Sequence, residues 1–316
     1  MSAPKTAEDR LLAWIEQTTG PLPKSIQIGP GDDGAVIQTP SGDRLVLTID
    51  TLVEGVDFET SSSSPQSVGQ KSIAVSLSDL AAMGASPWVA LASASFPSST
   101  HENYAQKIVE GLRSTASEYG VSIIGGDLSS TPGPISISTT LIGFLSTNRC
   151  LTRSGGHAGD QLFVSGPLGG SILGRHLNVT PRIELGQKLI AIPATSAIDL
   201  SDGLLKDLDR LARASGCGGE IQADKIPIHA DAHRLSRSSE FSPLEHALFD
   251  GEDFELLFTL SPADSELWKQ GQILTDFSAI PIGQLTESAG LTLIQADGNR
   301  ETVSPKGFSH DWGVSG

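Results

Sequence analysis

Apolar, strand-like runs that end in aspartate recur along this chain. Four of them are Arg44–Asp50 (RLVLTID), Ile73–Asp79 (IAVSLSD), Val121–Asp127 (VSIIGGD) and Ser196–Asp202 (SAIDLSD), the last of which carries two carboxylates. A fifth acidic turn holds Asp32 and Asp33 within the glycine-containing segment Ile28–Ala35. Strand ends in α/β proteins are where ligand sites collect. We therefore expect these carboxylates to converge.

Converging carboxylates repel one another unless a cation offsets their charge. Oxygen ligands with no matching cysteine or histidine set favour Mg²⁺, Mn²⁺ or Ca²⁺ over zinc. Mg²⁺ is commonly shared with a phosphate, so the pattern indicates a metal-dependent nucleotide enzyme. The chain contains neither GxxxxGK[ST] nor GxSxG. Direct in-line phosphoryl transfer, which depends on positioning and charge neutralisation, is then the simplest chemistry.

Each acidic motif also has a structural explanation. An isolated Gly-Asp-Asp is more often an Asx turn, and a lone Ser-Asp more often caps a helix. Repetition of the motif after apolar runs favours a site. The glycine-rich Gly166–Gly174 is interpreted as a tight strand-to-helix connection, because it lacks the P-loop ending. The histidines without metal spacing are expected at the surface, namely His157, His229, His233 and His246.

Composition narrows the function classes. The chain has 316 residues and a net charge of −16, which argues against nucleic-acid binding. Its two cysteines, Cys150 and Cys217, form no disulfide framework and no zinc motif. The N-terminus lacks a signal-peptide pattern, and no apolar stretch approaches the roughly 20 residues of a membrane span. We expect a cytoplasmic protein with no membrane or nucleic-acid partner.

The expected elements alternate between helices and strands in both halves, which indicates a mixed α/β architecture. Apolar spacing predicts helices at Ala7–Thr19, Glu102–Tyr119 and Asp202–Ala214, and a short helical turn at Asp79–Ala85. Strands are predicted at Val46–Ile49, Val89–Phe96, Ile135–Leu145, Asp160–Ser165, Phe254–Leu260 and Leu291–Gln295. The polar, glycine-rich Thr152–Gly159 is the candidate boundary between domains spanning 1–150 and 151–316.

Taken together, the motifs closely resemble the thiamine-monophosphate kinase family. The resemblance rests on Gly31–Val36, Thr48–Phe58, Ser76–Pro87, Gly125–Asp127, Leu151–Gly155, Ala197–Leu204 and Gly251–Leu257, in the family's order. It implies phosphorylation of thiamine phosphate to thiamine diphosphate, with ATP as co-substrate and several Mg²⁺ ions. It also implies a homodimer whose N-terminal, ATP-binding domains form a shared β-barrel. Each C-terminal α/β domain would complete the substrate site.

The resemblance also assigns roles to individual residues. The implied metal ligands are Asp33, Thr48, Ile49, Asp50, Asp79, Asp127, Asp199 and Asp202. ATP would be held by Gly126, Asp127, Arg153 and Ser201, and thiamine phosphate by Asp57, Glu252 and Phe308. Because transfer is direct and metal-assisted, no residue is assigned as a covalent catalyst.

Two positions depart from the family pattern. Ile49 replaces a hydroxyl residue, which is harmless if that position gives a metal only its backbone carbonyl. Asp57 replaces a substrate-contacting histidine, and an acid there is expected to repel a phosphate-bearing substrate.

Two alternatives stay open. One is an enzyme like aminoimidazole ribonucleotide synthetase, a member of the same superfamily, although Leu151–Gly155 and Gly251–Leu257 disfavour it. The other is a non-catalytic nucleotide-binding relative. The absence of any cysteine before Cys150 excludes a selenophosphate synthetase.

Overall fold

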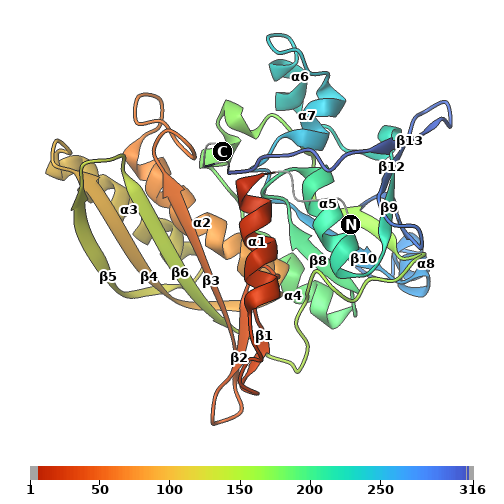
Figure 1. Ribbon diagram of the computed structural model, residues 1–316, viewed down its shortest axis with the longest axis horizontal. Coiled ribbons are helices and arrows are strands. Elements are labelled where there is room, and N and C mark those ends of the chain that lie inside the picture. Colours follow the sequence, from red (N-terminus) through yellow and green to blue (C-terminus); the bar gives the residue numbers. More distant parts are fainter. Residues whose placement is uncertain (1–5, 311, 313–316) are drawn as a thin grey trace.

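The computed structural model describes residues 6–310 and 312 and contains two separate β-sheets (Figure 1). The six-stranded sheet runs in the order β1 (Ile26–Ile28), β2 (Ala35–Gln38), β3 (Arg44–Val53), β6 (Ser136–Phe144), β4 (Ser86–Pro97) and β5 (Ser122–Thr131). The seven-stranded sheet runs β13 (Arg300–Val303), β12 (Leu291–Ile294), β9 (Gly218–Gln222), β11 (Ile280–Thr286), β7 (Gln161–Val164), β10 (Leu256–Leu260) and β8 (Ser196–Asp199). Both sheets are mainly antiparallel, with parallel pairs only at β4–β5 and β9–β12 among the described strands.

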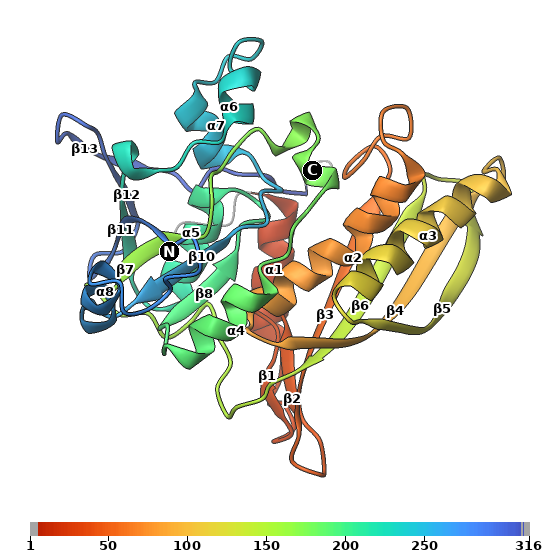
Figure 2. The ribbon, with the colours of Figure 1, turned by 180° about the vertical axis from the view of Figure 1, so that it is seen from behind.

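Eight α-helices accompany the sheets in the described part of the chain. They are α1 (Ala7–Thr18), α2 (Pro65–Ala82), α3 (Glu102–Glu118), α4 (Ile183–Ala191), α5 (Leu204–Ala214), α6 (Ala230–Leu235), α7 (Pro243–Phe249) and α8 (Pro262–Lys269). Helices α2 and α3 cover one face of the six-stranded sheet, as the view from behind shows (Figure 2). Within the described residues, none of these helices combines the length and the apolar character needed to cross a membrane.

The expected mixed α/β architecture is confirmed, as are the helices near residues 7, 102 and 204. One prediction was wrong, because Ile73–Asp79 is the C-terminal part of helix α2 rather than a strand. This segment is buried on nearly every side, so its apolar run lacks the one-sided spacing of a surface helix. Two other strands continue past their aspartates, β3 to Val53 and β5 to Thr131.

Helix α2 packs against helix α3 through glycines. A Cβ atom on Gly69 would lie 1.9 Å from the Ile108 carbonyl oxygen, and one on Gly111 would lie 2.0 Å from that of Gln66. Only a residue without a side chain allows the two backbones to approach so closely. The two helices can therefore lie side by side in close contact on one face of the sheet.

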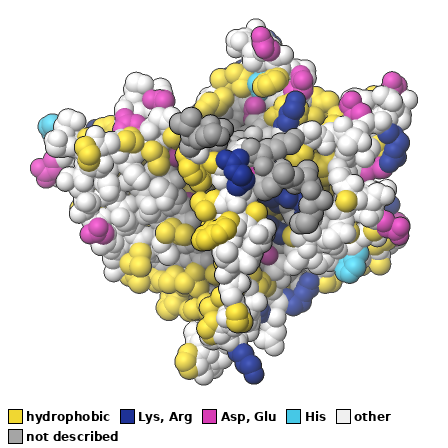
Figure 3. Space-filling model, viewed as in Figure 1, with side chains coloured by type: hydrophobic (Ala, Val, Ile, Leu, Met, Phe, Trp, Pro, Cys, Tyr) yellow, Lys and Arg dark blue, Asp and Glu magenta, His cyan; other side chains and the backbone are white. Residues whose placement is uncertain are grey.

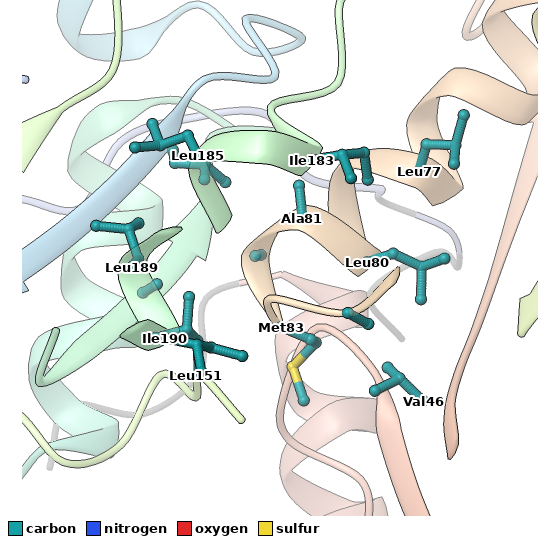
Figure 4. Close-up of a cluster of buried hydrophobic side chains, with 14 of the residues drawn as sticks. Val46, Leu77, Leu80, Ala81, Met83, Leu151, Ile183, Leu185, Leu189 and Ile190 are labelled. Atoms are coloured by element: carbon teal, nitrogen blue, oxygen red, sulfur yellow. The ribbon is translucent and has the colours of Figure 1, made fainter. Parts of the chain in front are cut away.

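The other end of α2 packs against α4 of the C-terminal half. Figure 4 shows this buried cluster, in which the labelled residues are Val46, Leu77, Leu80, Ala81, Met83, Leu151, Ile183, Leu185, Leu189 and Ile190. Here again a glycine allows close contact, because a Cβ on Gly186 would lie 2.0 Å from the Ala81 carbonyl oxygen. The two halves of the chain thus share one hydrophobic core.

The substitution Gly186→Ala is expected to lower the free energy of unfolding by about 1–3 kcal/mol, because the methyl group would push the α2 backbone away. Helix propensity alone would favour alanine by about 1 kcal/mol. Gly20→Ala is the control, since a Cβ there meets nothing within 4 Å. Denaturant unfolding measures both variants. A Gly186→Ala protein as stable as the parent would contradict the tight contact.

Candidate active site

Three carboxylates from distant parts of the chain meet at the junction of the two halves. One oxygen of each of Asp33, Asp79 and Asp199 lies within 4.8 Å of the other two. Asp33 comes from the turn before β2, Asp79 from the last turn of α2, and Asp199 from the end of β8. We call this group the carboxylate triad.

Each carboxylate of the triad is held by a hydrogen bond from a neighbouring element. The Thr48 hydroxyl of β3 donates to Asp79, and the Ser78 hydroxyl donates to Asp199 at 2.7 Å. Arg153 donates to Oδ1 of Asp33 at 2.6 Å from its guanidinium group. The other Asp33 oxygen, Oδ2, is buried and has no hydrogen-bond partner among the described residues.

The pKa values of these carboxyl groups show that burying them close together disfavours their charged forms. Burial, followed by the charges of Asp50, Asp199 and Asp33, raises the pKa of Asp79 well above its usual value. The pKa of Asp199 is likewise raised, first by burial and then by Asp33. Asp50, whose carboxylate accepts a 2.8 Å bond from Ser76 on α2, also has a raised pKa because it is buried.

These properties fit a divalent metal. The ligand atoms are all oxygens, as Mg²⁺ and Mn²⁺ prefer, and one of them is an unpaired buried carboxylate oxygen. A cation would remove the repulsion that raises the pKa values. The residues that could hold such ions are the triad, with Thr48 and Asp50 beside it.

Two predicted metal ligands lie apart from the triad. The carboxylate of Asp202 pairs with Lys206 at 2.9 Å and with Arg210 at 2.7 Å, so two cations already balance it. Asp127 lies in the exposed edge strand β5. Three strand spacings separate β5 from β3, or about 14 Å.

Strand register also places Asp127 on the other face of the sheet. Asp127 aligns with Ser93, Ser93 with Ser138, and Ser138 with Thr51. Asp50 neighbours Thr51, and successive residues of a strand point to opposite faces. The expectation that all the aspartates converge is therefore wrong within a single chain. The reason is that strand order, which places β4 and β6 between these residues, cannot be read from the motifs.

The neighbouring Gly126 shows why this motif needs glycine. A Cβ there would lie 1.8 Å from the Ala92 carbonyl oxygen of the adjacent strand.

The two positions that depart from the family pattern differ in their surroundings. Ile49 points its side chain outward, with 66% of its surface exposed. The Asp57 carboxylate accepts a 2.7 Å bond from the Val53 backbone nitrogen and so closes its own turn.

Four of the predicted nucleotide and substrate residues lie in sequence-distant loops of the C-terminal half, and Arg153 among them contacts the triad at Asp33. Glu252 donates its backbone N–H to the Ser201 carbonyl at 2.7 Å, and Phe308 donates to the Asp202 carbonyl at 2.9 Å. The Phe308 ring is 43% exposed. Arg153, Ser201, Glu252 and Phe308 therefore belong to segments that adjoin the ends of β8 and β10.

Sequence reasoning missed several supporting residues. Lys71 is fully buried on α2 and pairs with Glu252, although a lysine in a helix is normally exposed. His246 was expected at the surface but is only 3% exposed, and it lies between Ser239 and Asp250. Ser76 and Ser78, which donate hydrogen bonds to Asp50 and Asp199, are also supporting residues. Their place in the SLSD motif beside Asp79 was the sequence signal that could have identified them.

Comparisons with known proteins find relatives both in sequence and in structure. The family described as AIR synthase related protein matches with its N-terminal domain over residues 31–145 and its C-terminal domain over 135–295. A thiamine-monophosphate kinase of Rhodopirellula baltica is 41% identical, over 96% of this chain and 97% of that protein. A solved structure of AaThiL complexed with AMPPCP and TMP matches with a TM-score of 0.82 at 31% identity, covering 96% of this chain and 97% of the other. A crystal structure of thiamine monophosphate kinase from Aquifex aeolicus has a TM-score of 0.73 at 31% identity, covering 85% and 92%.

The raised pKa values predict how pH and metal affect stability. A carboxyl whose folded pKa is raised binds its proton more tightly in the folded than in the unfolded protein, so stability falls as pH rises between the two values. This pH window runs from the ordinary aspartate pKa of 3.8 up to the raised pKa. For Asp32, which lies beside Asp33, burial raises the pKa to about 7. Mg²⁺ is therefore expected to raise Tm more at about pH 8 than at about pH 5.5, where protons compete.

Thermal unfolding with and without Mg²⁺ at both pH values measures this effect. Asp79→Asn should reduce the Mg²⁺ effect, whereas Asp276→Asn, a change at an exposed position, should retain it. An equal rise in Tm at the two pH values would argue against carboxylates as the ligands.

Proposed function

The chain belongs to the thiamine-monophosphate kinase family, and we propose that it transfers the γ-phosphoryl group of ATP directly to thiamine phosphate, forming thiamine diphosphate. The observation that carries the proposal is the carboxylate triad, which lies in a chain similar over nearly its whole length to kinases of this name. The triad suits a substrate pair that is rich in phosphate. A relative with the same fold, AaThiL, has been solved in complex with AMPPCP and TMP.

In this proposal the triad, with Thr48 and Asp50, holds several Mg²⁺ ions around the phosphates. When bound, the metals would neutralise phosphate charge and so allow two anions to approach. The Thr48, Ser76 and Ser78 hydroxyl groups orient the carboxylates before any ligand arrives. Ile49 contributes at most its backbone carbonyl, because its side chain faces away.

Arg153 and Ser201 are assigned to ATP in the same proposal. The Arg153 guanidinium is partly exposed, with 21% of its side chain accessible, and it already points at Asp33. It can therefore donate to a phosphate beside the metal ligands. Glu252, the Asp57 turn and Phe308 would bind thiamine phosphate, the aromatic ring facing the cationic thiazolium. Asp202, balanced by Lys206 and Arg210, would join the metals only if it left these partners.

We also propose that the protein is a homodimer. Each chain would consist of two domains, with the boundary near residue 150. The uncovered face of the six-stranded sheet carries exposed apolar side chains, including Ile49 and Leu91, which both align with Thr140. Hydrophobic side chains gather over the lower part of this sheet in the space-filling view (Figure 3). Such a face on an otherwise acidic protein suits a second copy of the same surface.

Two free strand edges give the dimer a geometry. Within β3, only Arg44–Leu47 pair with β2, so residues 48–53 have no strand neighbour on that side in the described chain. The outer edge of β5 is also unpaired. Pairing each β5 with the free part of the partner's β3 would close two sheets into one barrel. It would bring Gly126 and Asp127 beside the segment of the partner subunit that holds Thr48 and Asp50.

The activity itself is tested by measuring ATP consumption with and without thiamine phosphate. Turnover is expected to require thiamine phosphate and Mg²⁺, and to stop with EDTA. Asp79→Asn should lower kcat about 100-fold or more, because it removes charge beside the phosphates. Asp276→Asn serves as the exposed control. A rate of ATP consumption that is the same with and without thiamine phosphate would contradict the proposal.

Subunit mixing tests whether Asp127 acts across the dimer. Asp79→Asn and Asp127→Asn should each be inactive alone. In a mixed dimer, however, one of the two sites receives both intact residues. Refolding the variants together in equal amounts should restore about a quarter of the parental rate. No recovery would show that Asp127 serves its own chain or serves no site, and a monomer by light scattering would exclude the dimer.

A further inference from the structure

Lys71 is a lysine in the middle of the protein. It lies on α2 with none of its surface exposed, and lysine is almost never fully buried unless it is paired. Its ammonium group donates to the Asp57 carbonyl oxygen at 2.6 Å and pairs with the Glu252 carboxylate. Eight residues of helix separate it from Asp79, which corresponds to about 12 Å along the axis. Lys71 therefore belongs to a different part of the site from the carboxylate triad.

The two partners of Lys71 come from opposite halves of the chain. Asp57 lies in the turn after β3, and Glu252 lies 181 residues from Lys71 in the loop before β10. The other carboxylates of this loop are bound within the C-terminal half. Asp250 accepts from the Gly170 nitrogen at 2.8 Å, and Asp253 pairs with Arg175 at 2.9 Å. Glu252 is thus the loop's ionic link to the N-terminal half in the described structure.

The backbone at Glu252 is itself constrained. Its φ of 62° is left-handed, a conformation that residues other than glycine rarely adopt. Such strain persists only where surrounding contacts determine the conformation, and it is concentrated at functional sites. The contacts here are the Ser201 carbonyl, which accepts from the Glu252 nitrogen, and Lys71. About a quarter of the Glu252 side chain (27%) stays accessible, so the carboxylate retains a face for a ligand.

We propose that Lys71 is a positioning residue for thiamine phosphate, which fixes the Glu252 carboxylate and the Asp57 turn at a set separation across the junction of the two halves. The inference rests on the proposed function, since it requires Glu252 to contact the thiamine moiety. Burial raises the pKa of Glu252 and Lys71 opposes that rise, so the ion pair also favours the charged carboxylate that a cationic ring requires.

The proposal predicts a selective defect. Lys71→Met keeps a long buried side chain but leaves Glu252 unpaired. KM for thiamine phosphate is expected to rise about tenfold or more, while KM for ATP stays within about twofold. Lys71→Arg, which keeps the charge, should restore part of the affinity. Lys188→Met, at an exposed lysine on α4, is the matched control and should change neither constant.

A double variant separates positioning from general destabilisation. If Lys71 acts through Glu252, then Lys71→Met combined with Glu252→Gln should raise KM for thiamine phosphate no further than Glu252→Gln alone. The positioning role would be overturned if the two substitutions raised KM for thiamine phosphate by independent factors that multiply. It would also be overturned if KM for thiamine phosphate and KM for ATP both rose in proportion to the loss of Tm.

The parent protein distinguishes failure of this inference from failure of the function. Binding of thiamine phosphate is measured by calorimetry in addition to the kinetics. If the parent binds and turns over thiamine phosphate and the Lys71→Met variant has the same affinity and KM, only the role of Lys71 is refuted. A parent that neither binds nor phosphorylates thiamine phosphate refutes the proposed function, and the role of Lys71 with it.

Discussion

Helix α2 lies between the two halves of the chain, and its packing fixes where they meet. One end contacts α3 through paired glycines, and the other contacts α4 where Gly186 leaves room for the Ala81 backbone. The polar groups of α2 then reach in different directions. Ser76 and Asp79 contact β3, whereas Ser78 contacts the end of β8. A single rigid helix thus sets the distances between groups that no local sequence could position.

The carboxylate triad is a consequence of that arrangement, and it has an electrostatic cost. Three acids are brought within 4.8 Å of one another in a buried place, and hydroxyl groups and one arginine orient them without neutralising all of them. Folding energy from the shared hydrophobic core opposes their repulsion. A divalent cation would be attracted to a site of this kind, because it relieves repulsion that already exists.

The motifs predicted that acidic side chains meet, but they did not predict the position of each one. Asp33, Asp79 and Asp199 do converge, because each lies where a chain segment reaches the junction of the halves. The separation of Asp127 could not be predicted, since it depends on strand order and on which face each residue occupies. The apolar run at Ile73–Asp79 predicts a strand although the segment is helical, because burial on nearly all sides removes the one-sided spacing of a helix. Lys71 gave no signal, because its partner lies 181 residues away.

The loop before β10 has a consequence for how this protein can change. Glu252 and Phe254 both have left-handed backbones, with φ of 62° and 50°. Glycine would relieve the backbone strain at either position, but it would also remove the partner of the buried Lys71 or the Phe254 side chain from the core. A substitution that relaxes this loop therefore loses more in side-chain contacts than it gains in the backbone. Selection for heat resistance alone is expected to retain both residues, so the shape of the loop and the stability of the fold change together.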